Sequence, residues 1–154
     1  MTCLIDSVFK NDLGSAKLAL AQGADPNERD HDGRSALLQA TIDGKIDFVS
    51  LLLDYDVDVN VLDDLGFSAL HYAAQNHFPD AARLLIAHGA KVDTEDFHGN
   101  TPLARAVFNS QGKGDMISVL LDAGADRNHP NKHGQSPLNL AKLIANYDVL
   151  QYFE

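Results

Sequence analysis

A short segment that begins with glycine recurs four times along the chain at nearly constant spacing. It reads GRSALL at 33–38, GFSALH at 66–71, GNTPLA at 99–104 and GQSPLN at 134–139, so its glycines lie 33, 33 and 35 residues apart. Leucine-rich segments alternate with it: LALAQGADPN, LLLDYDVDVN, LLIAHGAKVD and VLLDAGADRN. Internal periods of this length are typical of solenoid proteins, in which each repeat packs against its neighbours.

Each repeat has the residue types needed to start and stop two helices. A hydroxyl residue two positions after each glycine can cap a helix; these residues are Ser35, Ser68, Thr101 and Ser136. Pro102 and Pro137 then stand at the first helical position, where proline is tolerated. A leucine that we expect in the core follows each cap: Leu37, Leu70, Leu103 and Leu138. The second helix ends at a glycine that can adopt the left-handed conformation of a C-cap: Gly23, Gly89 and Gly124.

This pattern resembles that of the ankyrin-repeat family over essentially the whole chain. The family pattern is Gly-x-Thr-Pro-Leu-His-x-Ala-Ala, then a leucine-rich helix and Gly-Ala-Asp-Val-Asn, and residues 66–93 match it most completely. The resemblance implies an all-α solenoid of helix-turn-helix pairs with projecting β-hairpin loops. We expect about five units in one domain: a cap at 1–31, repeats at 32–64, 65–97 and 98–132, and a cap at 133–154. His71 keeps the family's histidine, and we expect it to form a structural hydrogen bond near the helix start.

The segment FNSQGKGDM at 108–116 suggests a phosphate-binding loop, because glycine-rich loops before helices bind anions. A Walker loop requires a preceding strand and Gly-Lys-Ser/Thr, and neither is present. Thr101 and Gly124 are 23 residues apart, whereas Ser68 and Gly89 are 21 residues apart. The segment is therefore predicted to be a two-residue insertion between the helices of the fourth unit.

No catalytic constellation is evident. The segments GRSAL, GFSAL and GQSPL lack the second glycine of a nucleophile elbow. His129 and His133 have a metal-like spacing but no nearby cysteine. His98 and His133 occupy equivalent hairpin positions in adjacent repeats, which are too far apart for easy shared ligation. We predict no enzymatic activity, cofactor or metal. A metal-binding or hydrolytic protein that uses hairpin histidines and aspartates is a disfavoured alternative.

The chain is acidic, and its charge is uneven. It has 12 Lys and Arg against 22 Asp and Glu, a net charge of −10. Residues up to Gly66 have 13 acids and 5 bases, and the rest have 9 acids and 7 bases. Such a surface repels nucleic acid and favours encounter with a basic protein, although solubility alone is an alternative explanation. There is no membrane-length apolar run, no secretion signal and one cysteine, so we predict no membrane association and a cytoplasmic location.

The resemblance implies that partners bind a concave face built from hairpin tips and the exposed side of each first helix. The corresponding positions are Phe9, Lys10, His31, Asp32, Arg34, Ile42, Asp43, Asp64, Leu65, Phe67, Gln75, Asn76, Phe97, His98, Asn100, Phe108, Asn109, Lys132, His133 and Gln135. Six of them are large and apolar, which indicates a partner site if they are exposed; the alternative is that some complete the core. Exposure predicts that Phe67→Asp with Phe97→Asp abolishes binding and leaves the fold intact.

These features favour a non-enzymatic protein that binds, and inhibits or sequesters, one basic protein partner. Small ankyrin proteins of this kind include bacterial immunity proteins against secreted toxins, so the partner could be a basic toxin. A scaffold or regulatory adaptor with several partners is the alternative within the same class. We expect the free protein to be monomeric because a capped solenoid has closed ends.

Overall fold

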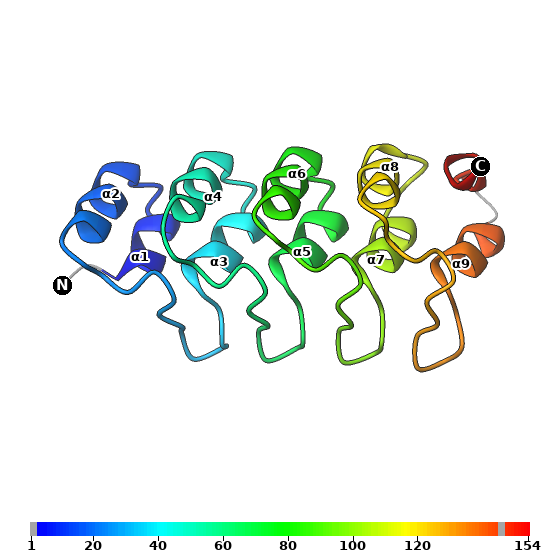
Figure 1. The fold of residues 1–154 in the computed structure, drawn as a ribbon, viewed down its shortest axis with the longest axis horizontal. Helices are drawn as coiled ribbons and strands as arrows, with labels where there is room; N and C mark the ends of the chain where they lie inside the picture. Colours follow the sequence, from blue (N-terminus) through cyan, green and yellow to red (C-terminus); the bar gives the residue numbers. More distant parts are fainter. Residues whose placement is uncertain (1–2, 145–146) are drawn as a thin grey trace.

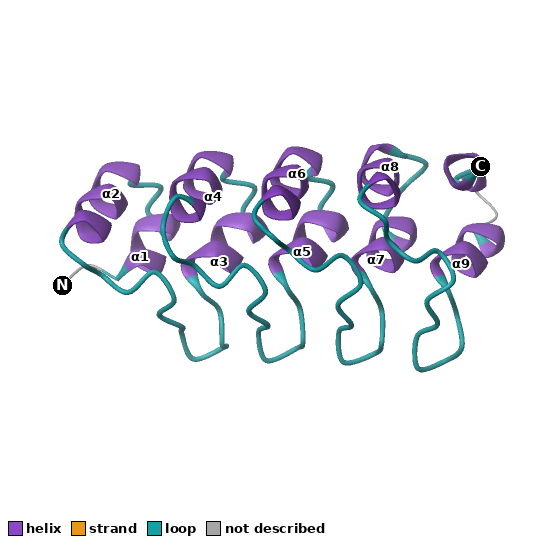
Figure 2. Cartoon of the chain, viewed as in Figure 1, coloured by secondary structure: helices purple, strands orange, loops and turns teal. Residues whose placement is uncertain are grey.

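The computed structural model describes residues 3–144 and 147–154, which fold into helix pairs repeated along one axis (Figure 1). The helices are α1 (Leu4–Phe9), α2 (Leu13–Ala21), α3 (Ala36–Ile42), α4 (Ile46–Leu53), α5 (Ala69–Gln75), α6 (Pro79–Ala87), α7 (Pro102–Phe108), α8 (Asp115–Asp122) and α9 (Pro137–Leu143), followed by the 3-10 helix η1 (Leu150–Phe153). The described residues contain no strand (Figure 2). Their β-pairing is limited to one isolated antiparallel bridge between Arg29 and Ser35. The predicted all-α solenoid is confirmed.

The helices form two layers. Figure 1 shows α1, α3, α5, α7 and α9 side by side as inner helices, with the outer helices α2, α4, α6 and α8 in a second layer above them. The long loops that connect each outer helix to the next inner helix project together from the opposite side of the inner layer. One surface of the molecule is therefore made of loop tips and inner helices.

The predicted helix caps are confirmed. The hydroxyls of Ser35, Ser68 and Thr101 accept hydrogen bonds from backbone N–H groups three residues on, at 3.3, 3.3 and 3.4 Å. Gly23, Gly89 and Gly124 have φ angles of 88°, 93° and 91°, the left-handed conformation that ends the outer helices. Hydroxyl caps thus start the inner helices, and left-handed glycines end the outer helices.

The core lies between the two layers. Leu37, Leu70 and Leu103 are almost completely buried, and burial of each stabilises the fold by about 1.5–3 kcal/mol. Leu138 is only partly buried, and among the described residues no further helix pair packs beyond α9. The core leucines therefore depend on the neighbouring repeat for their burial.

The glycine-rich segment lies between α7 and α8, as predicted, in a loop of residues 109–114. The equivalent loops of the two preceding units are 43–45 and 76–78. They are three residues shorter rather than two because, beyond the two-residue insertion, α8 begins one residue later in its repeat than α4 and α6 do. The longer loop contacts the C-terminal segment, since the Tyr152 hydroxyl donates a hydrogen bond to the Gly112 carbonyl at 3.4 Å. A Cβ on Gly114 would lie 2.2 Å from a Tyr152 ring carbon. The Tyr152 ring of the C-terminal segment thus packs against the backbone of the inserted loop.

Candidate protein-binding face

Four hairpins, at residues 30–34, 63–67, 96–100 and 131–135, share one internal hydrogen-bond pattern. The first residue of each donates its backbone N–H to the carbonyl of the fifth. Its Oδ1 atom also accepts the N–H groups two and four positions on, at 2.8–3.0 Å. This explains why each hairpin begins with Asp30, Asp63, Asp96 or Asn131. The tips are therefore held in the same conformation in every repeat.

Neighbouring hairpins are also joined to one another. Backbone hydrogen bonds link Asp64 to Asp32, Phe97 to Leu65 and Lys132 to His98. Gly66 has a φ of 78°, and a Cβ added there would lie 2.6 Å from a ring carbon of Phe97. The Phe97 ring thus lies across the backbone of the preceding hairpin. Together with the exposed ends of the inner helices, the four tips form one surface, here called the hairpin face.

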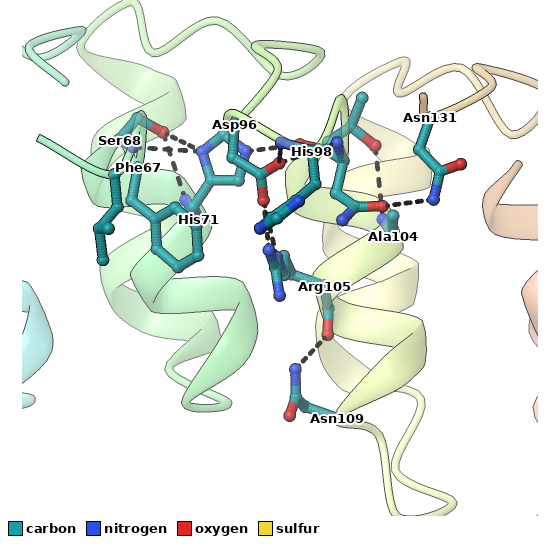
Figure 3. Close-up of polar contacts among 12 residues, drawn as sticks. Phe67, Ser68, His71, Asp96, His98, Ala104, Arg105, Asn109 and Asn131 are labelled. Carbon is teal, nitrogen blue, oxygen red and sulfur yellow. Dashed lines mark hydrogen bonds and ion pairs between the residues drawn. The ribbon is translucent and has the colours of Figure 1, made fainter. Parts of the chain in front are cut away.

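Phe67 is not exposed on this face, so that expectation is wrong. Its exposed fraction is 9%, because the guanidinium carbon of Arg105 lies 4.7 Å from the centre of its ring. The ring also stacks on the imidazole of His71, with centroids 5.5 Å apart (Figure 3). It contacts the Tyr72 ring as well. An arginine of the next repeat therefore covers Phe67 and makes it part of the core.

The carboxylate of Asp96 fixes the position of Arg105 (Figure 3). Arg105 donates from Nε at 2.9 Å and from Nη2 at 2.5 Å to a carboxylate oxygen whose side chain is fully buried. Burial opposes ionisation of Asp96, but the hydrogen bonds from Arg105 and from the N–H groups of Asn100 and His98 outweigh it and lower its pKa. The pair is therefore ionised and held by two hydrogen bonds at the base of the hairpin face.

His71 links two repeats, and its predicted structural role is confirmed. Its Nδ1 accepts the N–H of Ser68 at 3.2 Å, and its Nε2 donates to the Asn100 carbonyl at 2.9 Å. Burial lowers the pKa of His71, which favours the neutral imidazole that this arrangement needs. The third hairpin is thereby tied to the start of α5.

Most of the sequence-derived positions are exposed to solvent. The exposed ones are Phe9, Lys10, His31, Asp32, Asp43, Asp64, Leu65, Phe97, His98, Phe108, Lys132 and His133. Partly buried positions are Arg34, Ile42, Gln75, Asn76, Asn100, Asn109 and Gln135. Phe97 and Phe108 are 60% and 71% exposed. The expected surface aromatics are thus present except for Phe67, and their contact with a partner stays a prediction.

A groove of about 340 Å³ opens between the third and fourth hairpins. Its lining, here called the histidine groove, consists of His98, Asn100, Ala104, Arg105, Phe108, Asn131, His133 and Leu140. Sequence reasoning named His98, Asn100, Phe108 and His133 and missed the other four. It also missed Leu143, which is 69% exposed and lies nine residues after Gly134, as Phe108 lies nine residues after Gly99. That repeat offset was the available signal.

The histidine pairs considered for metal binding are not brought together with a third ligand among the described residues. His129 Nε2 instead lies 2.6 Å from a carboxylate oxygen of Glu95. Among all the residues that the structure describes, one group of three potential metal ligands lies together: Asp30, His31 and Asp32, with ligand atoms within 4.8 Å of one another. Asp30 already accepts two hairpin N–H groups, so the cluster is explained by the turn.

Comparison with known proteins identifies the family. The family model described as "Ankyrin repeats (3 copies)" matches residues 4–96 and 63–131. The chain is similar to the B-cell lymphoma 3 protein homolog of Mus musculus, with 30% identity over 86% of this chain and 30% of the relative. It is 32% identical to the Neurogenic locus notch homolog protein 1 of Xenopus laevis over 84% of this chain and 5% of the relative. It is also 37% identical to human Protein phosphatase 1 regulatory subunit 27 over 46% of each chain.

The fold, the repeated caps and these matches define an ankyrin-repeat solenoid, a class of protein that mediates protein–protein interaction. This chain belongs to the ankyrin-repeat family. It spans less than half the length of each of the three relatives described. None of the helices described has the length and apolar character needed to span a membrane.

Proposed function

We propose that this chain is a non-enzymatic binding protein whose hairpin face holds a basic protein partner. The observation that carries the proposal is the set of large apolar side chains exposed on one rigid surface: Phe9, Leu65, Phe97 and Phe108. Exposed apolar groups of this size commonly mark partner sites, and aromatic anchors within a polar frame are typical binding hot spots. Leu65 and Phe97 lie on hydrogen-bonded hairpins, and Phe9 and Phe108 end the helices α1 and α7, so little ordering entropy is lost on binding.

The charge of the face supports a basic partner. Asp32 and Asp64 are exposed at the tips of the first two hairpins, within the half of the chain that has 13 acids and 5 bases. Charges of this kind accelerate the encounter with an oppositely charged protein, and added salt screens them and reduces this acceleration. We therefore expect the partner's basic surface to face the first two hairpins.

Inhibition or sequestration is the effect that we favour, because a rigid face of this kind can cover a partner's functional surface. One relative is named as a regulatory subunit of a protein phosphatase, which supports a regulatory role by analogy. Neutralisation of a basic toxin, as an immunity protein, remains the narrower prediction. We further propose a cytoplasmic location, a monomeric free state and five units with the expected boundaries.

An adaptor with several partners is the second candidate. A separate groove of about 420 Å³ lies between α6 and α8 in the outer layer, lined by residues that include Arg83, Ile86 and Asp115. A second partner could bind there without competing for the hairpin face. Binding at both surfaces would distinguish an adaptor from an inhibitor, which uses one.

Affinity capture from a lysate of the source organism tests the proposal, with bound proteins identified by mass spectrometry. We expect one stoichiometric basic protein whose capture falls as salt is raised, and whose purified activity is blocked by this chain. Two partners captured simultaneously would support the adaptor. A partner that binds through the outer groove alone would overturn the proposed site.

A further inference from the structure

The histidine groove differs in charge from the rest of the molecule. The chain has 22 acidic and 12 basic residues, yet none of the eight residues lining this groove is acidic. Three other grooves each include an aspartate: Asp115 and Asp122 between α6 and α8, Asp47 beside α4, and Asp80 at the start of α6. An anionic group therefore meets less local repulsion in the histidine groove than in those three.

The polar residues of the groove are rich in hydrogen-bond donors. The imidazoles of His98 and His133 are exposed there. The Asn131 amide donates to Asn100 Oδ1 at 2.9 Å, so the Asn100 amide nitrogen is oriented as a further donor, and no described residue accepts from it. The guanidinium of Arg105 is paired with Asp96 and lies over the Phe67 ring of the preceding repeat (Figure 3), so the donors of the groove are the imidazoles and the asparagine amides. Asp96 itself is buried and neutralised by this pair.

The remaining lining is apolar. Phe108 is 71% exposed, and Ala104 and Leu140 complete the apolar wall between α7 and α9. Lys132 is exposed between Asn131 and His133 and adds a positive charge to the same hairpin. The groove thus offers donors on the hairpin side and an aromatic surface on the helix side.

We propose that the histidine groove receives a segment of the partner in which a carboxylate lies beside a large apolar side chain. Hydrogen bonds from the groove to a charged acceptor are stronger than those to a neutral one, and Phe108 would contact the apolar side chain. This inference rests on the proposed function and gives the partner an orientation. Its basic surface faces the first two hairpins, and its acidic and apolar segment faces the fourth.

Two short peptides test the chemistry without the partner. The first is acetyl-Gly-Leu-Glu-Gly-amide, and the second has glutamine in place of glutamate. NMR of the imidazole C–H signals should show that the glutamate peptide shifts His98 and His133 saturably, with a Kd on the order of 1 mM. The glutamine peptide should bind about fivefold more weakly or worse. Equal shifts from both peptides, or no shift at these histidines, would overturn the inference.

Variants separate this inference from the proposed function. His98→Gln with His133→Gln should raise the Kd of the glutamate peptide about fivefold or more, whereas His31→Gln in the first hairpin should leave it unchanged. All three imidazoles are exposed, so thermal melting should stay the same in each variant. If the intact partner binds the double histidine variant as tightly as the wild type, the proposed function stands and the groove assignment fails. If the glutamate peptide binds but no protein partner is captured, the preference of the groove for a carboxylate beside an apolar side chain stands and the proposed function fails.

Discussion

The Nε2 atom of His71 lies 2.9 Å from the carbonyl oxygen of Asn100, in the next repeat. Because Nδ1 of the same ring accepts the Ser68 N–H, the ring must donate from Nε2 and is therefore a neutral imidazole with one defined tautomer. A single side chain thus caps its own helix and holds the neighbouring hairpin. Protonation of the ring would place a second proton opposite the Ser68 N–H and break this arrangement.

The stability contributed by His71 should depend on pH. Burial lowers its pKa from the ordinary value of 6.5, so the unfolded chain takes up a proton before the folded chain does. Its contribution is complete above that ordinary value and is lost as pH falls through the lower pKa of the folded state. Urea unfolding of the wild type and His71→Leu from about pH 8 to about pH 5 should show a difference in unfolding free energy that shrinks on acidification. A constant difference would contradict this expectation.

Arg105→Met should destabilise the fold by about 3 kcal/mol, because it leaves the buried Asp96 carboxylate unpaired and uncovers the Phe67 ring. Asp96→Asn removes the charge and keeps the oxygen that accepts two hairpin N–H groups, as Asn131 does in the fourth hairpin. Arg105→Met should therefore cost much less in the Asp96→Asn background. A double-mutant cycle in urea measures both values, and equal costs would show that the ion pair does not stabilise the third hairpin.

Asp93→Asn should stabilise the array by about 0.5–1 kcal/mol. At the equivalent position, Asn60 donates to the Gly89 carbonyl at 3.1 Å and accepts the Lys91 N–H at 2.8 Å. Asp93 accepts the Asp126 N–H at 3.0 Å, but a carboxylate cannot donate to the next repeat. The urea midpoint should rise for Asp93→Asn and fall for Asn60→Asp.

Asp148→Asn, at an exposed position, is the control for the change in net charge. An equal rise of the midpoint in Asp148→Asn would attribute the stabilisation to reduced charge repulsion. The expected result is a rise that is specific to Asp93→Asn, because only that amide faces the following repeat.

Gly114→Ala should loosen the C-terminal segment, since the added Cβ would overlap the Tyr152 ring. The φ of Gly114 is −99°, so alanine is compatible with the backbone and the effect isolates the steric contact. Hydrogen exchange at Val149 and Phe153, which are buried, should accelerate. Tyr152→Ala alone should also accelerate it, and Gly114→Ala should add little to that variant. Additive effects of the two substitutions would mean that the Tyr152 ring does not pack against Gly114.

The sequence predicts the helices and their caps, because these depend on residue types that recur every 33 or 35 positions. The role of His71 is predicted by the resemblance to the family pattern, since the other repeats lack this histidine. It does not predict the burial of Phe67, which depends on an arginine in the following repeat. At the position of Arg105 the earlier repeats have Gln39 and Tyr72, so no repeated pattern indicates a guanidinium there. The contact between Tyr152 and Gly114 likewise joins two segments that do not recur in the other repeats, so no repeated pattern predicts it.

The burial of Phe67 changes the design of the binding test. Phe67→Asp would place a carboxylate in the core, so a combination that includes it would lose the fold and report nothing about binding. Phe97 and Phe108 are exposed and can be changed to aspartate with little effect on folding. Leu18, on the outer helix α2, has an exposed fraction of 59%, close to the 60% of Phe97, and is a matched control.

The most direct test is the affinity of the captured partner for Phe97→Asp with Phe108→Asp, compared with Leu18→Asp and the wild type by calorimetry. We expect the double variant to bind at least about 100-fold more weakly, since hot-spot aromatics each contribute about 2 kcal/mol or more. Leu18→Asp should bind like the wild type, and all three proteins should melt at similar temperatures. Unchanged affinity in a folded double variant would show that the partner does not bind the hairpin face.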